Sequence, residues 1–349
     1  MKQLTLSLIF ILVTIFIAAS PSQESTNSTL TIIGHDSTLV SEKVLAEFES
    51  QYNTKVEFIL AGDAGSVLNR VILSKDNPIA DVIYGVDNTF LSRAIEYEIF
   101  EEYTSTNLLN VLPEFRSEIS NQATPINYGD VCINIDQKFF DEKGLDPPKT
   151  IADLTHENYK NMLVVQNPAI SSPGLAFLLI TIAKSNENNF LDYWEKLKTN
   201  GVKVVGDWET AYFQEFSGAT GTGDRPLVVS YGSSPPFEVI YSEKPIDKPS
   251  TTVMTSDSSC FRQIEYAGIL KGTSQKSLAE KWIDFMLTPV FQSDMPLTMF
   301  VFPVISDISL RAEFLNFLSI PEKTSTLSAN EIATNREKWI NDWRNLMMR

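Results

Sequence analysis

One acidic side chain in a run of small residues is the clearest candidate for chemistry in this sequence. Asp63 stands in AGDAGSVLNR, between an expected strand and an expected helix, with Ala64 directly after it. Small residues let a ligand approach the backbone closely, and the carboxylate can pair with a positive charge. The same carboxylate could instead cap the helix that follows. The loop is not a phosphate-binding P-loop, because the GxxxxGK[ST] pattern is absent.

Hydroxyl groups occupy two further loops between an expected strand and an expected helix. In NPAISSPG, Ser171 and Ser172 precede a helix, where hydroxyls and free backbone N–H groups suit a hydroxyl or a phosphate. Helix capping explains these serines equally well. In SYGSSPP, an aromatic residue and three small residues end another expected strand: Tyr231, Gly232, Ser233 and Ser234. They suit one face of a flat ligand, and a tight turn would have the same composition.

Trp208, in GDWETAY, is expected at the mouth of a fourth such turn, as a platform for a ligand or as a packing residue. Together, one carboxylate, two aromatic rings and several hydroxyls predict a pocket for a flat organic cation. Contact between a cation and an aromatic face contributes about 0.5–2 kcal/mol. The two His and two Cys show no metal-ligand spacing, so we predict no metal site and no cofactor.

A parallel α/β arrangement has to position these loops. Strands are expected at 30–34, 55–60 and 80–87 with helices between them, an order that requires right-handed crossovers. The second half of the chain has the same alternation of strands and helices, with strands expected at 162–168 and 202–206. Further helices are expected at 88–103, 151–159 and 207–218. Ligands of such sheets lie at the carboxyl ends of the strands, which is where the four loops stand.

Two long strands predict that the chain crosses between two lobes. The segment 127–136 alternates apolar and polar residues, and a second strand is expected over 261–270. We therefore predict a two-lobed α/β fold with a ligand cleft between the lobes. Its expected parts are lobe 1 (28–127 plus 266–310), lobe 2 (128–265) and a C-terminal helical segment (311–349) packed on the lobes.

Composition and the N-terminus narrow the class of protein. The chain has 44 acidic and 28 basic residues, and its net charge of −16 argues against binding to nucleic acid or to anionic membrane surfaces. Residues 1–22 combine Lys2, an apolar run and small residues, the pattern of a signal peptide that is cleaved after export. We predict a monomer in the periplasm or secreted.

In this order, these segments resemble the thiamine-binding periplasmic proteins that supply ABC importers. The resemblance runs from about Leu30 to the C-terminus and rests on GDAGSVLNR, ADVIYGVDNTFL, NYGDVCINID, SSPGLAFLL, GDWETAY, VVSYGSSP, KWIDFMLTPVFQ, VFPV and REKWINDW. It implies a class II two-lobed binding fold, a bound thiamine or thiamine phosphate, a membrane permease as partner, and no enzymatic activity.

The resemblance also assigns ligand contacts. Carried over by motif, they are Asp63, Ala64, Ser171, Ser172, Trp208 and Tyr231 through Ser234. His35 and Phe300 are additional lining residues, at positions where the family usually has a different aromatic residue.

Two alternatives remain open at this level. One is a binding protein for another small organic cation such as a polyamine, which would use several acids with aromatic residues. The other is a thiaminase-like transferase, which resembles this fold and needs a cysteine nucleophile. Cys132 and Cys260 both stand in strand patterns rather than in a loop opening a helix. An oxidising location also allows these two cysteines to form a disulfide, and the sequence does not decide whether they do.

Overall fold

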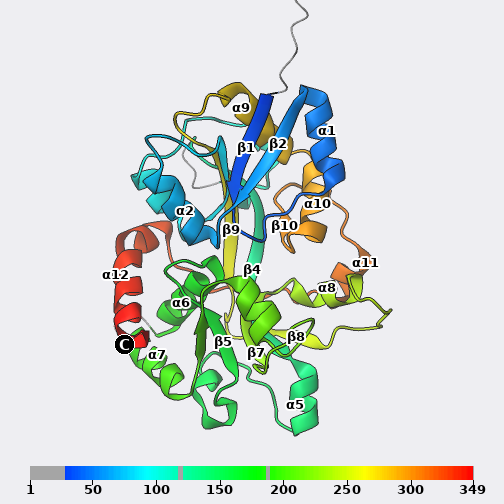
Figure 1. Cartoon of the computed structure of the whole chain (residues 1–349). Coiled ribbons are helices and arrows are strands. Elements are labelled where there is room, and N and C mark those ends of the chain that lie inside the picture. The colour runs from blue at the N-terminus through cyan, green and yellow to red at the C-terminus, as the bar shows by residue number, and fades with distance from the viewer. Residues whose placement is uncertain (1–27, 117–120, 186–188, 349) are drawn as a thin grey trace, which may run out of the picture.

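A computed structural model describes residues 28–116, 121–185 and 189–348 of the chain (Figure 1). The expected signal peptide, residues 1–22, lies outside the described residues. Across the described ranges, no helix combines the length and apolar character that a membrane span requires.

Ten strands of the described chain form one sheet, in the order β2-β1-β3-β9-β4-β7-β5-β6, with β8 and β10 also paired to β4. The strands are β1 (Ser28–Gly34), β2 (Thr54–Leu60), β3 (Val82–Asp87), β4 (Thr124–Asp136), β5 (Leu163–Gln166), β6 (Lys203–Val205), β7 (Leu227–Tyr231), β8 (Thr251–Met254), β9 (Phe261–Ile269) and β10 (Phe302–Pro303).

Helices surround both ends of this sheet (Figure 1). They are α1 (Glu42–Tyr52), α2 (Ala64–Leu73), α3 (Leu91–Glu96), α4 (Pro113–Arg116), α5 (Gln137–Lys143), α6 (Ser172–Ser185), α7 (Phe190–Thr199), α8 (Ser234–Ile240), α9 (Lys276–Met286), α10 (Pro289–Thr298), α11 (Ala312–Phe317) and α12 (Ala329–Met347). Short helical turns are η1 (Leu108–Asn110), η2 (Asp153–Thr155), η3 (Glu157–Tyr159) and η4 (Thr210–Glu215).

The first parallel unit is β1, β2 and β3, which confirms the expected strands of the N-terminal half. Leu30 and Ile32 of β1 face a core shared with α1, α9 and α10, whereas Ile33 faces the core that contains α2. Because helices cover both faces, the consecutive residues Ile32 and Ile33 are both apolar and fully buried although they point to opposite faces. The strands end in the loops that hold His35 and Asp63.

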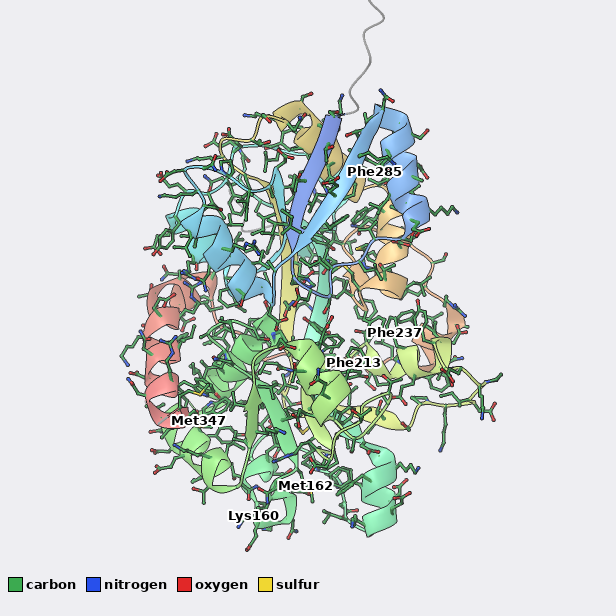
Figure 2. The ribbon with its side chains drawn as sticks, in the orientation of Figure 1. Lys160, Met162, Phe213, Phe237, Phe285 and Met347 are labelled. Carbon is green, nitrogen blue, oxygen red and sulfur yellow. A yellow bond between two sulfur atoms is a disulfide. The ribbon has the colours of Figure 1, made fainter. Side chains whose placement is uncertain are left out.

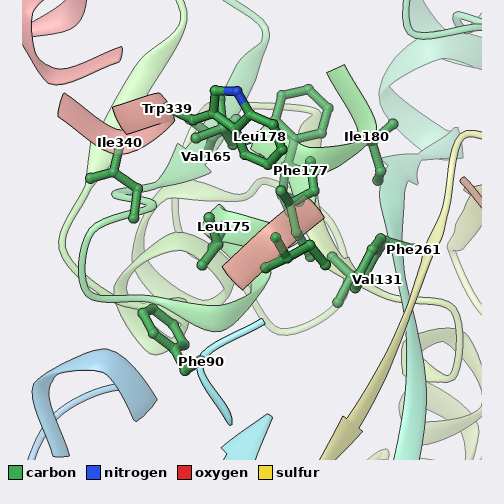
Figure 3. Packing of buried hydrophobic residues seen from close by; sticks show 14 of the residues in the cluster. Phe90, Val131, Val165, Leu175, Phe177, Leu178, Ile180, Phe261, Trp339 and Ile340 are labelled. Carbon is green, nitrogen blue, oxygen red and sulfur yellow. The ribbon is translucent and has the colours of Figure 1, made fainter. Parts of the chain in front are cut away.

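The second parallel unit is β5, β6 and β7, again with a different core on each face. Val165 of β5 packs with α6 and α7, whereas Val164 packs with the π-helical segment η4. Figure 3 shows Phe177 and Leu178 of α6 near Val165 and Trp339 of α12, in the buried cluster that also contains Leu175. The carboxyl ends of these strands lead to the loops before α6, η4 and α8.

The antiparallel pair β4 and β9 connects the two units, as Figure 1 shows. The pair runs from Thr124 opposite Ala267 to Val131 opposite Phe261, and just beyond it a disulfide joins Cys132 and Cys260. The two-lobed α/β class expected from the sequence is confirmed. We propose that the lobes comprise residues 28–127 plus 266–310 and residues 128–265. The C-terminal helix α12 packs against α3 of the first lobe and α7 of the second.

Three expected helices are wrong in extent. The segment 88–103 forms only α3, because Glu98 adopts a positive φ of 53° and the chain then pairs Phe100 with Leu270. The segment 151–159 forms the two short turns η2 and η3, and in both of these segments tertiary contacts override the local helical pattern. The segment 207–218 is helical over 208–215, ending in the π-helical η4, and Asp207 caps its start by accepting from Thr210 N–H at 2.7 Å, so only the ends of this expected helix differ.

We predict that the Cys132–Cys260 disulfide stabilises the crossing strands. It closes a span of 128 residues, and loss of a native disulfide typically costs about 2–5 kcal/mol of unfolding free energy. Urea unfolding of the wild type with and without reductant measures this cost. A Cys132→Ala, Cys260→Ala variant serves as the control, because its midpoint should not respond to reductant. An unchanged wild-type midpoint after complete reduction would contradict the prediction.

Candidate functional site

A partly enclosed cleft lies where the two lobes meet. Its walls come from both lobes and from the segment before β10. The lining residues are His35, Ser37, Asp63, Ala64, Ser172, Pro173, Trp208, Tyr231, Glu265, Met299, Phe300 and Val301. Five of the nine predicted contacts and both predicted additional lining residues are among them.

Asp63 occupies the N-cap position of α2, but its carboxylate makes no capping hydrogen bond. Instead its Oδ2 atom accepts a hydrogen bond of 3.2 Å from the backbone N–H of Trp208 in the other lobe. Burial raises the pKa of Asp63 to about 6, although the nearby Ser171 hydroxyl and His35 favour its charged form. The carboxylate is therefore a buried acid aimed across the cleft rather than a helix cap.

Trp208 is fixed by contacts on the side away from the cleft. Its indole Nε1 donates to Ser230 Oγ at 2.9 Å, and the Tyr212 ring stacks on it with centroids 5.2 Å apart and planes 18° apart. The ring of Tyr231 lies 6.3 Å away at 63°. The two aromatic residues thus form a corner of the cleft, not two parallel walls.

Tyr231 lines the cleft, but the three small residues after it do not. Gly232 donates its N–H to the Asp130 carbonyl at 2.7 Å, and the Ser233 hydroxyl donates to the Phe300 carbonyl. Ser234 Oγ lies 3.3 Å from Ser230 Oγ, behind the Trp208 indole. In SYGSSPP, the residues after Tyr231 therefore support the cleft wall from behind and begin α8.

The two serines of the NPAISSPG loop also differ in position. Ser171 is fully buried and does not line the cleft, whereas Ser172, the first residue of α6, does. The Ser172 hydroxyl donates to Oδ2 of Asp87, and the backbone N–H of Thr89 donates to Oδ1 of the same carboxylate at 2.7 Å. Burial raises the pKa of Asp87, and these two hydrogen bonds stabilise its charged form.

Glu265 of β9 is a second carboxylate in the cleft wall, and we did not predict it. It is 3% exposed, and its oxygens accept from Asn127 at 2.9 Å and from Gln263 at 3.2 Å. His35 Nε2 lies 3.4 Å from its Oε1 atom. Burial raises the pKa of Glu265, but the His35 charge and the hydrogen bonds from His35, Asn127 and Gln263 together outweigh this effect, and the net pKa is lowered.

The same ion pair determines the state of His35. Burial lowers the pKa of the imidazole, but the charge and hydrogen bond of Glu265, together with the charges of Asp63 and Asp36, outweigh burial, and the net pKa is raised. The ring fits because Gly85 has no side chain: a Cβ atom there would lie 2.5 Å from His35 Cδ2. Gly85 is also the extra residue of a β-bulge in β3, with φ of +96°. Such bulges redirect strands beside functional sites.

Direct contacts hold the lobes together around the cleft. The backbone N–H of Gly65 donates to the Ile170 carbonyl at 3.0 Å, and Ser37 Oγ donates to Glu209 Oε1 at 3.3 Å. A Cβ atom at Gly65 would lie 2.9 Å from the Ile170 backbone, so this approach requires glycine. The structure therefore shows the cleft with its lobes in contact.

Besides Glu265, the sequence interpretation missed Ser37, Pro173, Met299 and Val301 as lining residues. One signal could have found Glu265. In FRQIEYAGIL, Gln263 and Glu265 share a strand face with Phe261, so polar groups occupy the buried face of an otherwise apolar strand. A buried carboxylate requires partners, which marks such a position as a candidate site.

The arrangement fits a donor-rich organic cation. Two carboxylates face a corner of aromatic rings, and a cation gains from both kinds of contact. No group of His, Cys, Asp or Glu within the described residues could hold a metal ion. Two α/β lobes that contact each other around such a cleft are the architecture of a binding protein for a small solute.

The chain belongs to the family of bacterial extracellular solute-binding proteins, whose family model matches residues 77–335. Among curated proteins, it is 29% identical over 310 residues to the thiamine-binding periplasmic protein of Salmonella typhimurium strain LT2, covering 86% of this chain and 87% of the relative. It is 27% identical over 303 residues to the protein of the same name from Escherichia coli strain K12, again covering 86% and 87%.

A solved structure described as a periplasmic thiamin binding protein superposes on the chain with a TM-score of 0.82 at 25% sequence identity. The superposition covers 94% of this chain and 99% of that chain. The similarity therefore extends over both lobes and the C-terminal helices.

We predict that Asp63 makes the stability of the ligand-free protein depend on pH. Its folded-state pKa of about 6 exceeds the ordinary value of 3.8, so its stabilising contribution is fully present below pH 3.8 and is lost as pH rises through 6. The loss is roughly 2–3 kcal/mol. Urea unfolding between pH 4 and 8 should show it for the wild type and not for Asp63→Asn. Identical pH profiles of the two proteins would contradict the assignment.

Proposed function

We propose that this protein captures thiamine, or a closely related organic cation, in the interlobe cleft and delivers it to an ABC importer. The curated relatives carry the name thiamine-binding periplasmic protein, and the solved neighbour is described in the same way. On this proposal residues 1–22 direct export to the periplasm and the protein acts there as a monomer.

The single observation that supports the proposal most strongly is that two buried carboxylates and two aromatic side chains line the same cleft. Asp63 and Glu265 are 8% and 3% exposed, and they share the cleft with Trp208 and Tyr231. A thiazolium ring supplies the cation, and an aminopyrimidine supplies hydrogen-bond donors for the carboxylates. The energy of pairing a charge with a buried carboxylate is large because water is excluded.

The transferase alternative requires a cysteine thiolate, and the structure offers none beside the cleft. Both cysteines of the sequence are joined in the Cys132–Cys260 disulfide, and neither lines the cleft. The polyamine alternative shares the carboxylates and aromatic rings with our proposal. The titration below separates these alternatives.

Titration of ligand-free protein with thiamine by calorimetry should show one site per chain, with thiamine recovered unchanged by mass spectrometry. Spermidine at the same concentration serves as the matched organic cation. Tight binding of spermidine without binding of thiamine would replace our proposal by the polyamine alternative. Release of a cleaved pyrimidine product would replace it by the transferase alternative.

We predict that Trp208 supplies most of the aromatic contact. Trp208→Ala should weaken thiamine binding at least about tenfold, because a desolvated cation–π contact contributes about 2 kcal/mol. It should also remove most of the ligand-dependent change in tryptophan fluorescence. Phe213→Ala is the control, since this ring packs edge-on against Trp208 at 5.5 Å but does not line the cleft. Figure 2 shows Phe213 near the level where the two halves meet.

If Trp208→Ala binds thiamine with wild-type affinity, Trp208 is a packing residue. Equal losses in both variants would indicate that repacking around η4, rather than a lost ligand contact, causes the effect.

A further inference from the structure

The two carboxylates that line the cleft differ in their partners. Glu265 lies 3.4 Å from the His35 imidazole and also accepts hydrogen bonds from two side-chain amides. Asp63 is 8% exposed, and its carboxylate accepts from the backbone N–H of Trp208 at 3.2 Å. The lining residues within the described chain include no Lys or Arg. Among these residues Asp63 therefore has no counter-ion of its own, because the imidazole is paired with Glu265.

The titratable groups around Asp63 are one imidazole, one phenol and several acids. They come from the loop after β1, the start of the η4 segment, β7 and β9: His35, Asp36, Asp207, Glu209, Tyr231 and Glu265.

Two of these groups act on Asp63 in opposite directions. Burial is the largest effect and raises the pKa of Asp63 to about 6, His35 favours the charged form, and Asp207 disfavours it. In the closed cleft without ligand, Asp63 is therefore half protonated near pH 6 and neutral below it.

An organic cation would supply the missing counter-ion. Trp208 and Tyr231 line the same cleft as Asp63, so a cation in contact with these rings lies beside the carboxylate. The charge of a thiazolium ring is permanent and does not depend on pH. An opposite charge within about 4–6 Å lowers the pKa of a carboxyl by about 1–3. A proton on Asp63 then leaves to solvent as the cation enters.

We infer that the cleft exchanges a proton for its ligand: capture of the organic cation displaces a proton from Asp63 to solvent. This inference rests on the proposed function and adds a regulatory property to it. Below pH 6 the cation competes with a proton for Asp63, so affinity rises as pH increases through 6 and levels off above it.

Calorimetry of thiamine binding to the ligand-free wild type, in two buffers of different ionisation enthalpy, counts the protons. We expect about half a proton released per thiamine at pH 6 and almost none at pH 8. The Kd should fall by about five- to tenfold as pH rises from 5 to 8. Binding without proton release at pH 6 overturns the inference and leaves the proposed function intact. Absence of thiamine binding at both pH values overturns both.

Asp63→Asn identifies the source of the proton. The variant should bind more weakly and lose this release, whereas any proton exchanged by His35 or by thiamine itself persists. Asp136→Asn is the matched control. Asp136 is 7% exposed and accepts from Phe139 N–H at 3.1 Å and from the Ser217 hydroxyl at 2.6 Å, but it does not line the cleft. Its proton release should equal that of the wild type. Equal release by Asp63→Asn and wild type overturns the assignment.

Carbon-13 NMR of the aspartate carboxyl groups reads the same titration without requiring a variant to bind thiamine. The Asp63 resonance of the wild type is the one missing from Asp63→Asn, or from Asp63→Ser, which can still cap α2, should the first variant not fold. It should titrate near pH 6 in the ligand-free protein and at lower pH in the thiamine complex. An identical midpoint in the two states, or an ordinary midpoint near 3.8 without ligand, overturns the inference.

Discussion

The burial of two carboxylates at the boundary between the lobes is the constraint on which the cleft depends. A buried charge is costly unless hydrogen bonds and opposite charges surround it. Glu265 meets this requirement within its own sheet, through Asn127, Gln263 and His35. Asp63 accepts instead from Trp208 of the opposite lobe, and burial still raises its pKa to about 6. The hydrogen bond that compensates the Asp63 charge therefore forms only when the two lobes are in contact. A bound cation would compensate this charge further and would stabilise the contact between the lobes.

The residues behind the cleft make its wall rigid. Ser230 and Ser234 hold the Trp208 indole, and Ser233 holds the backbone of Phe300, which has a positive φ of 62°. Gln263 contacts both the Tyr231 hydroxyl and Glu265. A wall whose side chains are fixed before binding loses less conformational entropy when a ligand arrives. Ser230, Ser233 and Ser234 thus contact or lie behind the aromatic residues of the cleft wall.

The fold brings these groups together by joining two parallel α/β units through one antiparallel pair of strands. The carboxyl ends of β1 and β2 lead to His35 and Asp63, and those of β6 and β7 lead to Trp208 and Tyr231. The pair β4–β9 fixes the two units relative to each other, and its disulfide lies directly beyond the last paired residues. Each unit therefore contributes one wall of the cleft.

The sequence by itself determined the elements and the loops between them, because hydrophobic periodicity and small-residue loops are local properties. It placed Asp63, Trp208 and Tyr231 at strand ends, where the structure has them. It did not determine which side chains face the cleft. Ser171 and Ser234 have the same local pattern as cleft residues, yet their side chains are buried behind the wall.

The sequence marks Glu265 as a polar residue on a buried strand face, but it does not place this residue in the cleft. Its position opposite Asp87 and Asn127 depends on two β-bulges and on pairing between strands far apart in the chain. A shift of one residue in such a register turns every side chain to the other face. Local patterns therefore decide what a segment becomes, and long-range strand register decides which of its side chains meet a ligand.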